Sequence, residues 1–160
     1  MSVLHLANRQ KTRLVDRRLL RRIARCLLEE LLRRDSYEIA VHLIGATEMA
    51  RLNQVYLRHQ GSTDVLTFNH QEGAAAESLY GEIFISVDDA LVHARRFDVS
   101  WQAEIARYLA HGLLHLEGFD DTAPGPRREM KRRENKLLKE LSRRFDLGKV
   151  GRGQNGVKRE

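Results

Sequence analysis

The sequence has few of the features on which secreted and membrane proteins depend. Its 160 residues include one cysteine, Cys26, so no internal disulfide can form and a reducing compartment is expected. No apolar run approaches the roughly 20 residues of a membrane span. The first residues, MSVLHLANRQ, lack the long apolar core of a signal peptide. These absences predict a soluble cytoplasmic protein.

Negative charge is also in short supply. The chain has 28 Lys and Arg residues against 22 Asp and Glu residues, a formal net charge of +6. The excess lies in two runs: residues 13–34 hold eight Arg against three acidic residues, and residues 127–144 hold nine Lys or Arg against three Glu. Either run alone fits a solvated helix face. Two runs in one small domain favour a polyanionic partner such as RNA.

The length predicts a single domain over residues 1–145, followed by a glycine-rich basic tail, 146–160, that we expect to be flexible. Alternating or short apolar segments predict strands at 3–7, 37–44, 65–68 and 83–87. Apolar residues at three- to four-residue spacing predict an arginine-rich helix over 15–33. Further helices are expected to begin near Thr47 and Ser100, which are suitable N-caps, near Asp88, and at about Arg127. Strands and helices do not alternate strictly, which indicates an α+β fold with a small sheet flanked by helices.

The segment HGLLHLEGFDD, residues 111–121, has the pattern of a metal site. His111 and His115 are four residues apart, so on a helix they lie one turn above each other and can converge on one ion. Gly118 can take the left-handed conformation that ends a helix, which lets the chain bring Asp121 back toward them. Two histidines and one carboxylate form a known catalytic zinc set that leaves a fourth position open.

Other interpretations of this segment remain. A histidine pair at this spacing can be accidental, or one member can satisfy a buried carbonyl. A metalloprotease is disfavoured because Gly112 stands where such enzymes have the glutamate that acts as general base. An iron(II) oxygenase would also accept two histidines and a carboxylate, but nothing in the sequence indicates a site for an organic co-substrate.

Three segments together resemble one known family. HGLLHLEGFDD resembles the H-G-x-L-H-L-x-G-Y-D-H signature of the YbeY family of endoribonucleases and rRNA maturation factors. LNQVYLRHQGSTDVLTF (52–68) resembles the family segment that ends in T-D-V-L-S-F. GEIFISVDDALVHA (81–94) resembles its G-D-I-x-I-S strand and the helix that follows. The resemblance runs in consistent order from about residue 37 to residue 140.

This resemblance implies an α+β fold with a small mixed sheet and a metal site at a helix C-terminus and the loop after it. It implies a zinc-dependent endoribonuclease, a hydrolase that acts on single-stranded RNA. It also implies a role in maturing the 3′ end of 16S rRNA and in ribosome quality control, with rRNA and the ribosome or a ribosomal protein as partners. His111, His115 and Asp121 would hold one Zn²⁺ and act in catalysis through it.

The sequence departs from the family pattern at two places. Asp121 stands where the family has histidine, which lowers the net charge of the site from +2 to +1 and makes manganese or iron(II) more competitive with zinc. Asp120 then matches the family's preceding aspartate. Some members carry an arginine in the loop before T-D-V-L, where this chain has Leu57. The adjacent Arg58 is a weak candidate for a catalytic contact to RNA phosphate, and an exposed helix-end charge is its alternative role.

Asp64 is expected to cap a turn, with a place in the cleft as the alternative, and His59 lies in the same loop. The histidines at 5, 42, 70 and 93 match no motif and receive no role. A second hypothesis is a non-catalytic ribosome-assembly factor with a structural metal. A fourth protein ligand, such as Asp120, would favour that hypothesis, whereas an open position on the metal favours the enzyme. The general base and the oligomeric state stay undetermined.

Overall fold

The computed structural model describes residues 2–57, 63–71 and 78–152. Four strands, β1 (Ser2–Asn8), β2 (Tyr37–Ile44), β3 (Val65–Asn69) and β4 (Leu79–Ser86), form one sheet in the order β1-β2-β4-β3. Strands β1, β2 and β4 are parallel, and β3 runs antiparallel along β4. The helices are α1 (Arg17–Arg25), the π-helix η1 (Cys26–Leu31), α2 (Ala46–Leu57), α3 (Val87–Phe97), α4 (Trp101–Leu116), α5 (Pro124–Arg144) and the 3-10 helix η2 (Leu147–Val150). The predicted α+β fold with a small mixed sheet is therefore confirmed.

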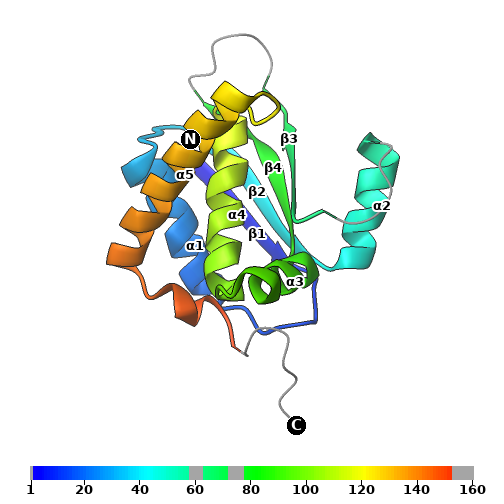
Figure 1. Ribbon diagram of the computed structural model, residues 1–160. Helices are drawn as coiled ribbons and strands as arrows, with labels where there is room; N and C mark the ends of the chain where they lie inside the picture. Colours follow the sequence, from blue (N-terminus) through cyan, green and yellow to red (C-terminus); the bar gives the residue numbers. More distant parts are fainter. Residues whose placement is uncertain (1, 58–62, 72–77, 153–160) are drawn as a thin grey trace.

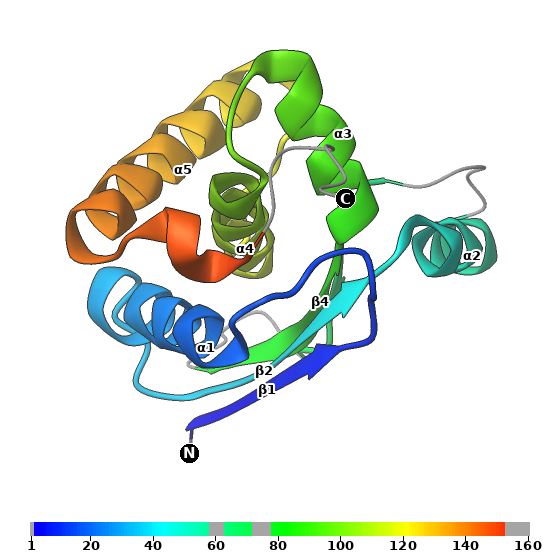
Figure 2. The same cartoon turned by 90° about the horizontal axis from the view of Figure 1, so that it is seen from below.

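The two faces of the sheet differ in chemistry because side chains alternate along each strand. On β2, Tyr37, Ile39, Val41 and Leu43 are buried and face the main core. Figures 1 and 2 show α1, α4 and α5 gathered over this face, while α2 lies apart at the other end of the sheet. A smaller apolar cluster on the opposite face joins α2 to the sheet; its buried members are Ile44, Met49, Leu66 and Phe84.

Helix α4 is the central helix of the fold. Eleven of its 16 residues are buried, and it lies between the sheet and α5 (Figure 1). At Gly112 an added Cβ would come within 2.8 Å of the Ile83 side chain on β4. The glycine therefore lets α4 approach the sheet closely. The space gained there is filled by the Ile83 side chain of β4.

Two expectations about helices need correction. The helix expected over 15–33 is an α-helix only to Arg25 and continues as the π-helix η1. Thr47 does not cap α2, because the helix already starts at Ala46, whose N–H donates to Asp88 Oδ2 at 2.7 Å. A side chain 42 residues away replaces a local cap, and local sequence cannot reveal that.

The expected boundary between domain and tail also moves. Residues 146–152 belong to the ordered fold: Leu147 and Val150 are buried in the core, and Gly151 forms a β-bridge with Val15. Charge and glycine content suggested a flexible segment, but the apolar side chains dock beside α4. Residues 153–160 lie outside the described part of the chain. Among the described residues, no helix is long and apolar enough to cross a membrane.

Candidate metal centre

The last two turns of α4 present two histidines on one side. Ser100 caps the helix at its start, where its side chain accepts from Ala103 N–H at 3.0 Å, as the sequence indicated. At the other end Gly118 has φ +106°, a conformation that favours glycine. The backbone reverses there, and Phe119 N–H donates to the Leu114 carbonyl. The reversal returns the chain toward the helix end and places Asp121 beside the histidines.

His111, His115 and Asp121 converge on one point. His111 Nε2 and His115 Nε2 are 3.1 Å apart, and Asp121 Oδ2 lies 3.5 Å and 3.4 Å from them, respectively. Ligands at the corners of a zinc tetrahedron with bonds of about 2.0–2.1 Å are roughly 3.3 Å from one another. The three residues form the one group of possible metal ligands found among the described residues. The triangle therefore fits a small tetrahedral cation.

The tautomers of the two histidines follow from their other contacts. His111 Nδ1 lies 2.7 Å from Glu134 Oε1, and His115 Nδ1 lies 3.1 Å from the Phe119 carbonyl oxygen. Both partners are acceptors, so each Nδ1 carries the proton and each Nε2 presents a lone pair. Two lone pairs facing each other at 3.1 Å repel unless a cation or a proton lies between them. The donor set thus has the chemistry of a metal site.

Glu134 on α5 orients this site, and the sequence analysis missed it. Its carboxylate is 4% exposed and also accepts from Arg107 Nη1 at 2.6 Å and Lys131 Nζ at 3.1 Å. Burial alone would raise the pKa of Glu134, but the hydrogen bonds from His111 and Arg107, together with the Lys131 charge, outweigh burial and bring this pKa down to about 2. The carboxylate therefore stays ionised and holds the imidazole ring of His111.

A signal for Glu134 was present in the sequence. It occupies a position on the apolar stripe of α5, with Met130 one turn before it and Leu137, Leu138 and Leu141 after it. An acidic residue on the buried face of an otherwise basic helix needs a partner, because an unpaired buried charge is costly. That partner could have been sought among the histidines of α4.

The other expected site residues have separate outcomes. Asp120 is not part of the triangle: its exposed carboxylate accepts from Thr122 N–H at 3.0 Å and from Thr122 Oγ1 at 2.8 Å, and these bonds lower its pKa. Asp64 Oδ1 accepts from Val65 N–H at 2.9 Å, the turn-capping role, and the residue also lines the cavity beside the triangle. Arg58 and His59 lie outside the described residues.

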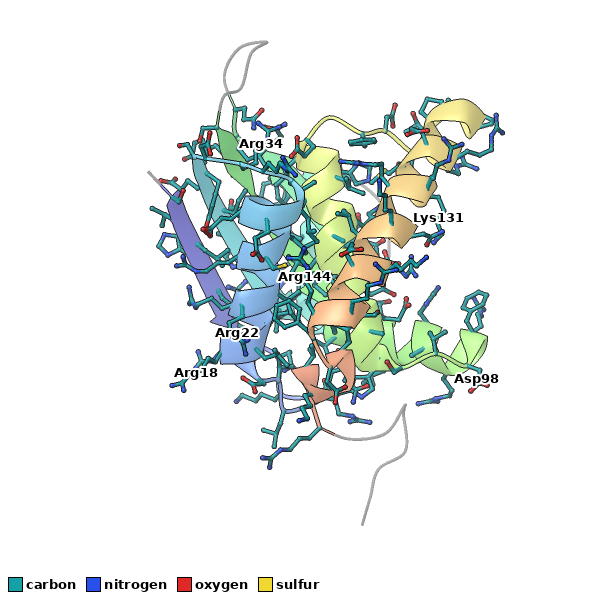
Figure 3. The ribbon with its side chains drawn as sticks, turned by 90° about the vertical axis from the view of Figure 1, so that its left-hand side faces the viewer. Arg18, Arg22, Arg34, Asp98, Lys131 and Arg144 are labelled. Atoms are coloured by element: carbon teal, nitrogen blue, oxygen red, sulfur yellow. The ribbon has the colours of Figure 1, made fainter. Side chains whose placement is uncertain are left out.

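One ion pair and one hydrogen bond hold the surroundings in place. Arg34, in the loop before β2, pairs in a two-pronged contact with Glu117 at the end of α4. Figure 3 shows Arg34 reaching toward that end of α4. On the other side, Arg127 Nε donates to the backbone carbonyl of Asp121 at 3.0 Å. The loop that carries Asp121 is thus fixed at both ends.

The fold also joins the two basic runs of the sequence. The Arg22 guanidinium lies 5.5 Å from the centre of the Phe145 ring, and Arg144 pairs with Glu30 at 3.1 Å. These contacts connect α1 and η1 to the end of α5. Figure 3 shows Arg18, Arg22 and Arg144 on the side of the molecule where α1 lies beside α5. Arginines from segments more than a hundred residues apart in the sequence thus come together.

Comparison with known proteins gives one consistent family. A family model described as "Endoribonuclease YbeY" matches residues 5–142. A Salinibacter ruber protein named Endoribonuclease YbeY is 42% identical over 94 residues, and the match spans 55% of this chain and 60% of that protein. A Chlorobium luteolum protein of the same name is 37% identical over 110 residues, 69% of this chain and 78% of its own length.

A solved structure agrees with these matches. The solution structure of the Thermotoga maritima protein TM1509 superposes with a TM-score of 0.66 at 25% sequence identity. The superposition covers 98% of this chain and 100% of that one. The agreement therefore extends to the docked segment after α5 and is not limited to the motif on α4.

Proposed function

Because the chain belongs to the YbeY family of endoribonucleases, we propose that it is a metal-dependent hydrolase that cleaves single-stranded RNA. His111, His115 and Asp121 would hold one zinc ion. The observation that carries this proposal is the triangle of two Nε2 atoms and one carboxylate oxygen, with an acceptor oxygen beside each Nδ1. Within residues 2–57, 63–71 and 78–152 the set has three ligands, which supports a catalytic site, since structural zinc sites use four protein ligands.

A bound zinc ion would supply Lewis acidity toward a phosphoryl oxygen and would make a nearby water a stronger nucleophile at neutral pH. The chain supplies the orientation of the site. Glu134 and the Phe119 carbonyl fix the two imidazoles, and Arg127 holds the loop that carries Asp121. The carboxylate in place of the family's histidine makes manganese or iron(II) more competitive at this site than at one of three histidines.

Positive charge near the site would help to bind the substrate. Arg107, Arg127 and Lys131 line the cavity beside the triangle, and the basic residues of α1 and of the end of α5 lie together elsewhere on the protein. Such surfaces bind the RNA backbone with an affinity that falls as salt concentration rises. We propose the cytoplasm as the location, and as substrate the precursor 3′ end of 16S rRNA. A role in ribosome quality control, with the ribosome or a ribosomal protein as partner, belongs to the same proposal.

The engaged Asp120 argues against the alternative of a non-catalytic assembly factor. That function would be favoured by a fourth protein ligand, and the Asp120 carboxylate is instead occupied by Thr122. A peptide hydrolase has no support either. Gly112, which follows the first histidine, packs against the Ile83 side chain of β4, so this position leaves no room for the glutamate of a metalloprotease.

The decisive experiment compares His115→Ala with a control variant, His5→Ala. His5 is an exposed histidine on β1 that is remote from the triangle in sequence and fold. Metal content is measured on each purified protein, and cleavage of a 3′-extended 16S rRNA fragment is followed with and without chelator. We expect His115→Ala to lose both the metal and cleavage, while His5→Ala keeps both. A full metal equivalent and full activity in His115→Ala would refute the site, and cleavage that survives thorough metal removal would refute metal dependence.

A further inference from the structure

A cavity of about 240 Å³ lies directly beside the metal triangle. His111 and Asp121 form part of its wall, so the cavity and the triangle are continuous. Val65 and Met130 provide apolar wall, and His93 and Tyr108 add ring surfaces. We call this space the side cavity. Its size and mixed lining suit a planar, partly polar group such as a nucleobase.

An exposed aromatic pair adjoins the side cavity on α3. The His93 ring, 40% exposed on its side chain, lies with its centroid 4.5 Å from that of Phe97, and the two planes are tilted by 39°. Phe97 is 58% exposed at the last position of α3. His93 lines the side cavity, and Phe97, which does not line it, packs beside the His93 ring at the protein surface. We call His93 and Phe97 the aromatic platform.

Cationic side chains stand near the same cavity. Lys131, with 60% of its side chain exposed, and Arg127 are on α5 and line the side cavity. Figure 3 shows Lys131 on α5 and Asp98, the residue after Phe97, on the same side of the molecule. Asp64 and Glu104 also line the cavity, so an occupant that combines a flat ring with negative charge would place its ring toward the aromatic platform and its charge toward Arg127 and Lys131. A nucleotide of RNA has this combination.

We propose that the side cavity and the aromatic platform form a subsite for one unpaired nucleobase next to the phosphate that is cleaved. This inference rests on the proposed function and adds a substrate contact to it. Bases in single strands can leave the stack and pack on aromatic side chains, whereas bases in a duplex are held in the stack and are out of reach. The subsite would therefore select single strands through base stacking. Stacking also tolerates any base, because every base has a π-face.

The test replaces Phe97 and measures binding separately from cleavage. Affinity for an end-labelled single-stranded RNA decamer is read by fluorescence anisotropy immediately after mixing with the metal-loaded protein. Cleavage is then followed on gels from the same samples. Phe97→Ala is expected to bind about 5- to 160-fold more weakly, the range for loss of one aromatic stacking partner. Phe97→Trp keeps an aromatic face and should bind like the natural protein.

Val92→Ala is the matched control, since Val92 is 62% exposed on the same helix and does not line the side cavity. It should leave binding unchanged, and affinity for the same sequence as a duplex should be equal in all variants. Equal single-strand affinity of Phe97→Ala and the natural protein would overturn the subsite. Binding that depends on Phe97, without cleavage by the natural protein, would leave the subsite standing and refute the proposed nuclease activity.

Discussion

Replacing Glu134 by glutamine tests whether this buried carboxylate orients the metal site. The carboxylate accepts three hydrogen bonds, from His111 Nδ1, Arg107 Nη1 and Lys131 Nζ. Glutamine has nearly the same shape, but one of its two terminal atoms becomes an amide nitrogen, which can only donate. Whichever way the amide turns, one of these donors then faces another donor.

The magnitude follows from these contacts. Loss of a group that orients a metal-ligating histidine typically weakens metal binding by about 10- to 100-fold, which corresponds to about 1.4–2.7 kcal/mol. In the metal-free protein, one hydrogen bond to a charged group is lost in a buried setting, which costs about 1.5–3 kcal/mol of unfolding free energy. Both effects should appear together in Glu134→Gln, because the same carboxylate serves His111 and Arg107.

Zinc affinity is measured by competition with a chelator of known strength, and stability by urea unfolding of the metal-free protein. Glu140→Gln is the control: this residue is on the same helix, pairs with Arg143 at 3.0 Å and is 34% exposed. Its surface pair should contribute less than about 0.5 kcal/mol, with no effect on zinc. Zinc affinity of Glu134→Gln within twofold of the natural protein would refute the orienting role.

Two further predictions concern stability. Burial and a hydrogen bond to Glu29 raise the pKa of Tyr37 from 10.0 to about 12. As the pH rises from 10 to 12, Tyr37 therefore loses its proton in the unfolded chain before it does so in the folded protein. The free energy of unfolding should fall by about 3 kcal/mol over this range. Tyr37→Phe should lack this part of the fall in urea titrations at several pH values, and an unchanged pH profile would contradict the assignment. An added Cβ in Gly151→Ala would collide with the Trp101 indole, so thermal unfolding should show that the free energy of unfolding falls by about 1–3 kcal/mol. Gly125→Ala is the control: Gly125 has open space around it, so this variant should unfold at nearly the same temperature as the natural protein. Equal melting temperatures for these two variants would show that the segment after α5 is not docked as described.

Local patterns in the sequence determined the parts of the fold that depend on near neighbours. Strict alternation predicted β2 with its observed bounds, Ser100 capped α4 as expected, and Gly118 ended it with positive φ. The histidine spacing and the glycine stop also predicted which three side chains would meet. All these signals act within about eleven residues, where helix and turn geometry fix side-chain positions with little help from the rest of the chain.

The tertiary structure alone decided what lies across the interfaces between elements. Glu134 reaches His111 from a helix 23 residues further along, and Asp88 caps α2 from 42 residues away. The docking of residues 146–152 beside α4 and the contacts between the two basic runs likewise depend on how helices pack over the sheet. Periodicity tells which face of a helix is buried, but it does not tell which element will cover that face. Those choices follow from the packing of the whole core, in which each contact depends on all the others.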